Sequence, residues 1–187
     1  MQTSKINIRS ATLNMTLIAV FAALLCVLSP LAIPTPMGVA FTLQVFAVVL
    51  TGLVLKPLHA LAAQVIYTLL GFCGLPVFAG YQSGAGVLFS PTGGFIVGFI
   101  AAAFFVSLLK GSLQGKYAVL RYPLTAIIVG IPCIYLPGVI GFMSATGRDF
   151  GTAFMLVAAT FIPVDLIKCA LAAAAALAVR KATAGFY

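Results

Sequence analysis

Charged side chains are scarce in this sequence, and acidic ones are almost absent. Only 6% of the 187 residues are charged, with ten lysines and arginines against two acids. Soluble domains carry about 25% charged residues, so these few charges could not cover the surface of a 19.4 kDa soluble protein. Disorder is excluded as well, because 63% of the residues are hydrophobic and disordered chains are poor in them. The composition therefore predicts a polytopic membrane protein.

Catalytic and metal-binding motifs are missing too. No GxxxxGK[ST] phosphate loop occurs, so the chain is not expected to hydrolyse ATP by itself. HExxH and GxSxG motifs are absent, and no cluster of carboxylates offers acid–base chemistry. The four cysteines are widely spaced and form no CxxC or Cys/His group. We therefore predict no enzyme activity, no catalytic residue, no bound metal and no cofactor.

The positive charges are distributed singly or in small groups between apolar runs. A nucleic-acid-binding protein gathers its basic residues on one face, so we expect no nucleic-acid partner. The distribution is instead typical of membrane topology signals.

Apolar runs separated by proline and glycine predict an all-α integral membrane protein with six transmembrane helices in a single domain, residues 1–187. Proline is well tolerated in a first helical turn, and Pro57, Pro91, Pro123 and Pro163 stand where four helices should begin. The first apolar run has no cleavage site after it, so we expect a span rather than a removable signal peptide. The predicted helices are about 11–33, 39–55, 57–73, 91–110, 122–142 and 163–183.

The basic residues predict the orientation of these helices. Most of them fall in segments that a six-helix chain brings to one side, whereas the opposite loops hold only Arg148, beside Asp149. The positive-inside rule then places both termini in the cytoplasm of a multi-pass protein of the cell membrane. The bases on the predicted inner side are Lys5, Arg9, Lys56, Lys110, Lys116, Arg121, Arg180 and Lys181.

The predicted outer connection between the third and fourth helices, residues 71–91, is rich in glycine and carries no charge. Irregular backbone at membrane depth survives only where protein buries it or a cavity bathes it. We expect a long loop folded back over the outer mouth of the bundle; a mobile outer loop is the alternative.

The last predicted helix contains the one acid and the one base that lie inside a span. The residue before a proline avoids helical geometry, so we expect a break at Ile162 and a helix that begins at Pro163. Asp165 and Lys168 would then lie in its first two turns, on one face. Charges at membrane depth normally face a cavity or a partner, which favours a ligand site over a mutually neutralising structural pair. Gln44, near the outer end of its helix, could line the same cavity.

These features favour a small-solute carrier or binding subunit with an outward-facing, largely apolar pocket. Two other classes stay open. One is a proton- or ion-coupled carrier that works alone with Asp165 as the coupling acid, and the other is a structural membrane subunit without a ligand.

Two motifs stand out in the chain. One is GLPVFAG from Gly74 to Gly80, followed by Gly84, Gly86 and the PTGG that begins at Pro91. The other is FIPVDLIK from Phe161 to Lys168. Together they resemble the BioY family, the biotin-binding S components of energy-coupling factor transporters, in which the second motif has the form F-x-P-x-D-x-x-K. The length and the six-helix layout also match, so the resemblance covers nearly the whole chain.

The resemblance implies capture of biotin from the outside for vitamin uptake, with biotin as transported ligand. It implies that Lys168 contacts the biotin carboxylate and that Asp165 and the loop residue Gln82 contact the ureido ring. We expect backbone N–H groups of the loop, at Gly80 and Gly84, to add donors. The chain departs from the family at Tyr81-Gln82-Ser83 and at Val164, where glycine is usual, and several S components for other vitamins share such a bundle.

The resemblance also implies partners: a transmembrane coupling protein and two ATPase subunits, which would supply the missing phosphate loop. Ala19 and Ala23 form a small-xxx-small pattern of the kind that lets membrane helices approach closely. This pattern resembles the surface that the family offers to its coupling protein, although packing within the bundle is the simpler interpretation.

Overall fold

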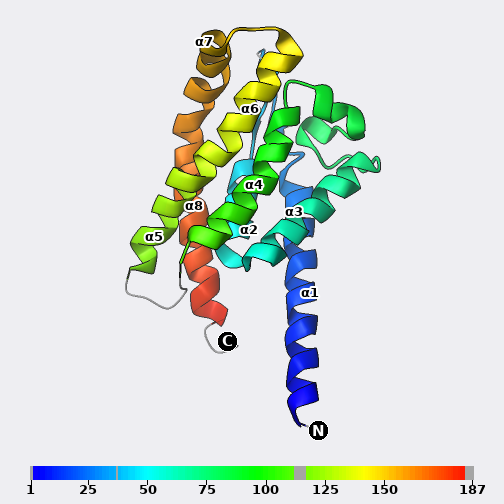
Figure 1. Ribbon diagram of the computed structural model, residues 1–187, viewed down its shortest axis with the longest axis vertical. Helices are drawn as coiled ribbons and strands as arrows, with labels where there is room; N and C mark the ends of the chain where they lie inside the picture. The colour runs from blue at the N-terminus through cyan, green and yellow to red at the C-terminus, as the bar shows by residue number, and fades with distance from the viewer. Residues whose placement is uncertain (1, 37, 112–116, 184–187) are drawn as a thin grey trace.

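The computed structural model of the protein describes residues 2–36, 38–111 and 117–183, and these residues are mostly helical (Figure 1). The first half contains α1 (Gln2–Leu28), the strands β1 (Ala32–Ile33) and β2 (Phe41–Thr42), α2 (Gln44–Val54) and α3 (Pro57–Phe72). Two short 3-10 turns, η1 (Ala79–Tyr81) and η2 (Ala85–Phe89), then lead to α4 (Gly93–Leu109). The second half contains α5 (Ala118–Thr125), the π-helical η3 (Ala126–Gly130), α6 (Ile131–Thr146), α7 (Phe150–Ala153), the π-helical η4 (Phe154–Ala159) and α8 (Thr160–Thr183).

Six continuous helical runs result within the described residues, because η3 joins α5 to α6 and η4 joins α7 to α8. Three of these runs are long and apolar enough to cross a bilayer: Ala11–Leu28, Ala118–Thr146 and Phe150–Val179. The helices α2, α3 and α4 are also apolar but shorter.

The connection between α1 and α2 is longer than the predicted helices 11–33 and 39–55 implied. The helix α1 ends at Leu28, and α2 does not begin until Gln44. Pro30 explains the early end, because a proline and the residue before it disfavour continuation of a helix. The intervening residues form an antiparallel hairpin in which Ala32 pairs with Thr42. The helices α3 and α4 lie within two residues of their predicted ranges 57–73 and 91–110.

The last two predicted helices, 122–142 and 163–183, begin earlier than expected. The helix expected from about residue 122 begins at Ala118, so Pro123 lies within it. The break expected at Ile162 is absent: helix runs from Phe150 to Thr183, with Pro163 inside it. A proline clashes with the carbonyl group four residues earlier, here that of Ala159, where the wider π-helical turn of η4 ends. Asp165 and Lys168 consequently lie near the middle of this helix rather than in its first two turns.

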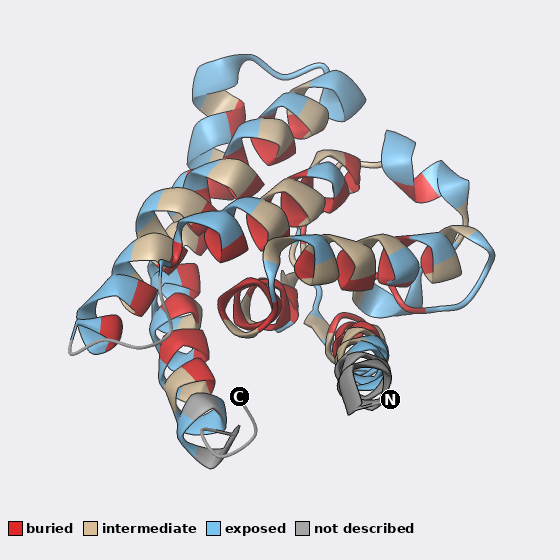
Figure 2. Cartoon of the chain, turned by 60° about the horizontal axis from the view of Figure 1, so that its bottom comes forward, coloured by how far each residue is buried: buried red, intermediate tan, exposed pale blue. Residues whose placement is uncertain are grey.

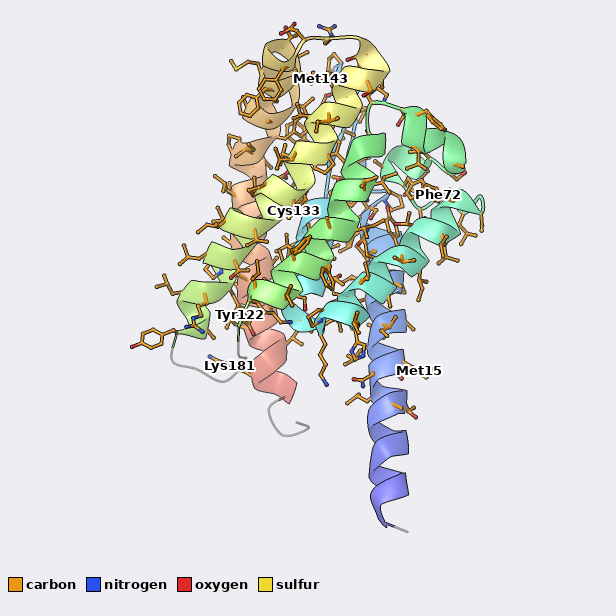
Figure 3. The ribbon with its side chains drawn as sticks, in the orientation of Figure 1. Met15, Phe72, Tyr122, Cys133, Met143 and Lys181 are labelled. Carbon is orange, nitrogen blue, oxygen red and sulfur yellow. The ribbon has the colours of Figure 1, made fainter. Side chains whose placement is uncertain are left out.

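The segments that carry most of the basic residues lie at one end of the bundle. Figure 1 shows α1 beginning and α8 ending at that end, together with the α2–α3 connection, the end of α4 and the start of α5. In Figure 3, Lys181 and Tyr122 lie toward this end and Met143 toward the other. Lys116 lies outside the described residues, as do the side chains of Lys5, Arg9 and Arg180.

Lys110, predicted only as a charge on the inner side, has a structural role. Its side chain is buried, and its amine donates hydrogen bonds to the carbonyl oxygens of Gly52 at 3.0 Å, of Leu53 at 2.9 Å and of Leu55. Ser107 donates to the same Leu55 oxygen at 2.6 Å. The last carbonyl groups of a helix lack partners within it, so Ser107 of α4 and Lys110, directly after α4, cap the end of α2.

The helices bury their inward sides and expose their outward ones (Figure 2). The helices α4 and α6 approach each other closely where glycines face backbone. A Cβ atom on Gly94 would overlap the carbonyl oxygen of Pro137, and one on Gly98 would lie 2.7 Å from that of Ile134. The absence of side chains at these positions brings two walls of the bundle together.

We predict that Gly94→Ala destabilises the protein. The added methyl group forces α4 and α6 apart, and overpacking of this kind costs about 1–3 kcal/mol. Thermal unfolding of the purified protein in detergent measures the effect. The matched control is Gly86→Ala, because a Cβ atom there meets nothing within 4 Å. An unfolding midpoint for Gly94→Ala equal to that of Gly86→Ala would contradict the prediction.

Candidate functional site

The described residues enclose a cavity where α2, α4, α6 and α8 meet the segment between α3 and α4. The space between its lining atoms, including open solvent at its mouth, is about 620 Å³. Most of its walls are apolar and a few polar groups converge on it. The lining residues are Val39, Ala40, Thr42, Gln44, Val45, Phe78, Ala79, Val87, Thr92, Phe95, Ile96, Phe99, Ile134, Tyr135, Phe161, Asp165 and Lys168.

The charged centre of the cavity is the carboxylate of Asp165, which is 3% exposed. Lys168, one turn further along α8, donates from Nζ to Oδ1 at 2.6 Å. Tyr135 of α6 donates from its hydroxyl to Oδ2 at 2.6 Å. Both carboxylate oxygens therefore have a partner, one on the same helix and one on a neighbouring helix.

This arrangement explains how two charges can lie inside an apolar bundle. Removing one partner of a buried ion pair typically costs about 3–5 kcal/mol, because the other charge is left uncompensated. The ammonium group of Lys168 has three N–H donors, of which the bond to Asp165 uses one. Lys168 can therefore also donate to a ligand anion.

Gln44 joins the same cavity from the start of α2. The hairpin sets its position, because its backbone N–H donates to Oγ1 of Thr42 at 3.2 Å. Its side-chain Nε2 donates to the hydroxyl of Tyr67 at 2.8 Å, and that hydroxyl donates to the carbonyl oxygen of Val77 at 3.2 Å. Asp165 and Lys168, predicted together as a charged pair, and Gln44, predicted separately as a buried amide, thus line one cavity.

Aromatic side chains form much of the apolar wall. Phe95 of α4 contacts Tyr135 edge-to-face, with ring centroids 5.8 Å apart. Phe41 of β2 packs on Phe161 of α8 at a centroid distance of 4.2 Å. These contacts hold flat, apolar surfaces beside the charged pair, as suits a ligand with an apolar body and polar ends.

The segment between α3 and α4 supplies one side of the cavity through Phe78, Ala79 and Val87. Phe78 is 2% exposed and lies edge-to-face on Tyr67, with centroids 5.7 Å apart. Its ring lies so close to Gly71 that a Cβ atom there would overlap it. The segment is therefore anchored to α3 by packing as well as by the bond from Tyr67 to Val77.

The three predicted ligand contacts in this segment, Gly80, Gln82 and Gly84, do not line the cavity. Gly80 and Gln82 are exposed, and Gly84 is half-buried. The N–H of Gly80 donates to the carbonyl oxygen of Pro30 at 3.2 Å, and that of Gly84 to the oxygen of Gly71 at 2.8 Å. In this conformation both N–H groups are thus engaged within the protein.

Among the residues that sequence reasoning missed are Tyr135 and Phe78 of the cavity lining and Tyr67, which is bonded to Gln44 behind it. A signal existed for the tyrosines, because a buried tyrosine hydroxyl usually finds a hydrogen-bond partner. It could not say which of several tyrosines reaches the cavity. Phe78 belongs to the GLPVFAG motif, but nothing in the sequence showed that its ring faces the cavity.

The predicted partner surface lies away from the cavity. Ala19 and Ala23 are both exposed on α1, so in this structure they do not pack within the bundle. In Figure 1, α1 lies at one side of the molecule. As for metals, the described part of the chain contains no group of three or more His, Cys, Asp or Glu side chains that could hold an ion.

Comparison with known proteins places this geometry in context. The model of the BioY family matches residues 1–185. A Lactococcus lactis protein named biotin transporter BioY2 is 41% identical over 170 residues, which cover 90% of this chain and 91% of the relative. A Thermotoga maritima protein named biotin transporter BioY is 38% identical over 162 residues, which cover 87% and 92%.

The fold also matches a crystal structure described as the S-component for biotin from an ECF-type ABC transporter. The TM-score is 0.81, over 92% of this chain and 93% of the other, at 22% sequence identity. At that identity the likeness establishes the fold. The family match over nearly the whole chain, together with the identity to these two relatives, shows that this chain belongs to the BioY family.

Proposed function

We propose that this protein captures biotin from outside the cell, as the substrate-binding subunit of an ATP-driven energy-coupling factor transporter. The observation that carries the proposal is the cavity in which Asp165, Lys168, Tyr135 and Gln44 meet within apolar walls. The relatives named biotin transporters and the fold of the biotin S-component support the same function. The protein is then a transport protein rather than an enzyme.

The chemistry of biotin matches the cavity. Biotin has one carboxylate on an apolar arm and a ring with two N–H donors and one carbonyl group. Lys168 offers a cation for the carboxylate, and Asp165 offers an acceptor for a ring N–H. Phe95 and Phe161 offer apolar surface for the arm and the ring.

Binding in this way requires the ion pair to open. Lys168 and Asp165 are 2.6 Å apart, whereas the carboxylate and the ring lie at opposite ends of an extended biotin. The ligand carboxylate then replaces Asp165 as the partner of Lys168. A ring N–H takes the place of the ammonium on Asp165, and Tyr135 keeps its bond to the other carboxylate oxygen.

In the proposed binding mode, part of the segment between α3 and α4 contacts the ligand as it stands, and another part must first move. Phe78 and Val87 already face the cavity. Contact of the ligand with Gly80, Gln82 or Gly84 requires the loop to move inward and to release the bonds to Pro30 and Gly71. The proposed contacts of Asp165 and Lys168 with biotin do not depend on this movement.

We further propose six spans in the cell membrane, with both termini in the cytoplasm. The support is the gathering of the basic segments at one end of the bundle, in accord with the positive-inside rule (Figure 1). The cavity then opens toward the outside. A transmembrane coupling protein and two ATPase subunits would complete the transporter, with Ala19 and Ala23 on α1 as the contact surface.

Loss of either charge should abolish tight binding of biotin. We predict that Lys168→Ala and Asp165→Asn each weaken binding by at least about 30-fold, since truncating one partner of a buried charge pair costs about 2–5 kcal/mol. Labelled biotin bound to purified protein in detergent measures the effect. The matched controls, Lys181→Ala and Asp149→Asn, change an exposed lysine of the same helix and the only other acid. A well-folded wild type that binds no biotin would overturn the proposed function.

Bulky side chains on α1 should block assembly and spare binding. We predict that Ala19→Leu or Ala23→Leu prevents co-purification with the coupling protein, because close approach of membrane helices requires small residues. The matched control is Ala170→Leu or Ala174→Leu, which alters a pair of exposed alanines at the same spacing on α8. Normal co-purification of the α1 variants would count against this surface.

The source of energy separates the proposal from a carrier that works alone with Asp165 as coupling acid. We predict that cellular uptake of labelled biotin requires the ATPase subunits and continues when the proton gradient is dissipated at constant ATP. Uptake that stops with the gradient and ignores deletion of the ATPases would favour the solitary carrier.

A further inference from the structure

A chain of hydrogen bonds leads from the cavity into the bundle. Gln44 donates from Nε2 to the hydroxyl of Tyr67 at 2.8 Å, and this hydroxyl donates to the carbonyl oxygen of Val77 at 3.2 Å. Tyr67 is fully buried, and Gln44 is 5% exposed. These hydrogen bonds therefore join Gln44, which lines the cavity, to Val77 in the segment that covers it.

The carbonyl group of Val77 fixes which groups donate and which accept in this series of hydrogen bonds. A backbone carbonyl can only accept a hydrogen bond, and a tyrosine hydroxyl has one proton to give. Because that proton goes to Val77, the oxygen of Tyr67 must act as acceptor toward Gln44. The buried Ser29 hydroxyl forms no hydrogen bond with the described residues, so it leaves this direction unchanged.

The direction decides which end of the Gln44 amide is left for a ligand. The two ends of an amide have nearly the same shape, so hydrogen bonds decide its orientation. With NH2 turned to Tyr67, the oxygen Oε1 is the end that remains. No group among the described residues donates a hydrogen bond to Oε1 of Gln44.

We infer that Tyr67 is a positioning residue for specificity: it holds Gln44 as a hydrogen-bond acceptor, so that the cavity selects a ligand with an N–H donor at this point. The inference rests on the proposed function, in which that donor is a ring N–H of biotin. Asp165 accepts the other ring N–H. The site thus presents two acceptors to the two donors of a cyclic urea, and one acceptor depends on a residue outside the cavity lining.

A locked acceptor rejects ligands that a free amide would accommodate. A glutamine free to turn could donate to a ligand oxygen as readily as it accepts from an N–H. With Tyr67 in place, a ligand oxygen at this point faces Oε1, and neither group has a donor. Leaving a buried acceptor unpaired is the source of discrimination.

The experiment compares biotin with its two cyclic carbamate analogues, each having one ring N–H replaced by oxygen. Dissociation constants are measured for all three ligands with the purified protein in detergent. Wild type should bind both analogues about 10-fold or more weakly than biotin, because each leaves one acceptor unpaired. In Tyr67→Phe the Gln44 amide can turn, so one analogue should recover to within about 3-fold of biotin. The other should stay weak, because an ionised Asp165 cannot donate.

Two further variants separate positioning from contact. Gln44→Met removes the acceptor, so it should weaken the binding of biotin. The dissociation constants of biotin and of the analogue that responds to Tyr67→Phe should then be about equal. Tyr135→Phe is the matched control, because it also removes a buried tyrosine hydroxyl, one whose partner is Asp165 rather than Gln44. It should leave the preference for biotin over the responsive analogue as in wild type. Equal weakening of all three ligands in folded Tyr67→Phe, with unchanged ratios, would overturn the inference.

A measurement without ligand tests the orientation itself, and it remains decisive if the protein binds no biotin. The side-chain NH2 resonance of Gln44 is assigned by its loss in Gln44→Met. In wild type, one of its protons should exchange slowly with solvent because it is bonded to Tyr67. In Tyr67→Phe this protection should disappear, and equal exchange in the two proteins would refute the orientation.

Discussion

The structure depends on giving the carboxylate of Asp165 hydrogen-bond donors inside an apolar bundle. Asp165 is almost completely buried, and each of its oxygens has a donor at 2.6 Å, Tyr135 on α6 and Lys168 on α8. Without these donors the charge would cost several kcal/mol. The bond to Tyr135 fixes the register of α6 against α8, and the bond to Lys168 places the cation beside the cavity. The same requirement therefore sets helix packing and the position of the two charges that a ligand would meet.

Close packing on the other sides of the bundle keeps this arrangement in place. Gly94 brings α4 against the backbone of α6 at Pro137, and Lys110 ties the end of α4 to the last carbonyl groups of α2. The cavity walls that α2, α4 and α6 contribute are thus held by backbone contacts and caps outside the cavity. A ligand meets walls that are already assembled, which reduces the cost of ordering them on binding.

The segment between α3 and α4 connects the cavity with the rest of the protein. Phe78 contributes to the cavity wall and packs on Tyr67, whose hydroxyl links Gln44 to Val77. The apolar contact fixes where the segment lies, and the hydrogen bonds fix the orientation of a polar group in the cavity. Shape and hydrogen-bonding pattern at this side of the site therefore depend on the same buried tyrosine.

The sequence by itself determined the class of protein and its family, because composition and two motifs are local properties. It also singled out Asp165, Lys168 and Gln44, since charged and amide groups in apolar helices are rare. Tertiary structure decided the rest. The π-helical turn of η4 carried the helix through Pro163, which moved the charged pair from its expected place near a helix start to the middle of a long helix. Which tyrosine lines the cavity, and which loop residues face it, depends on contacts between distant segments, because only packing determines which side of each element is turned inward.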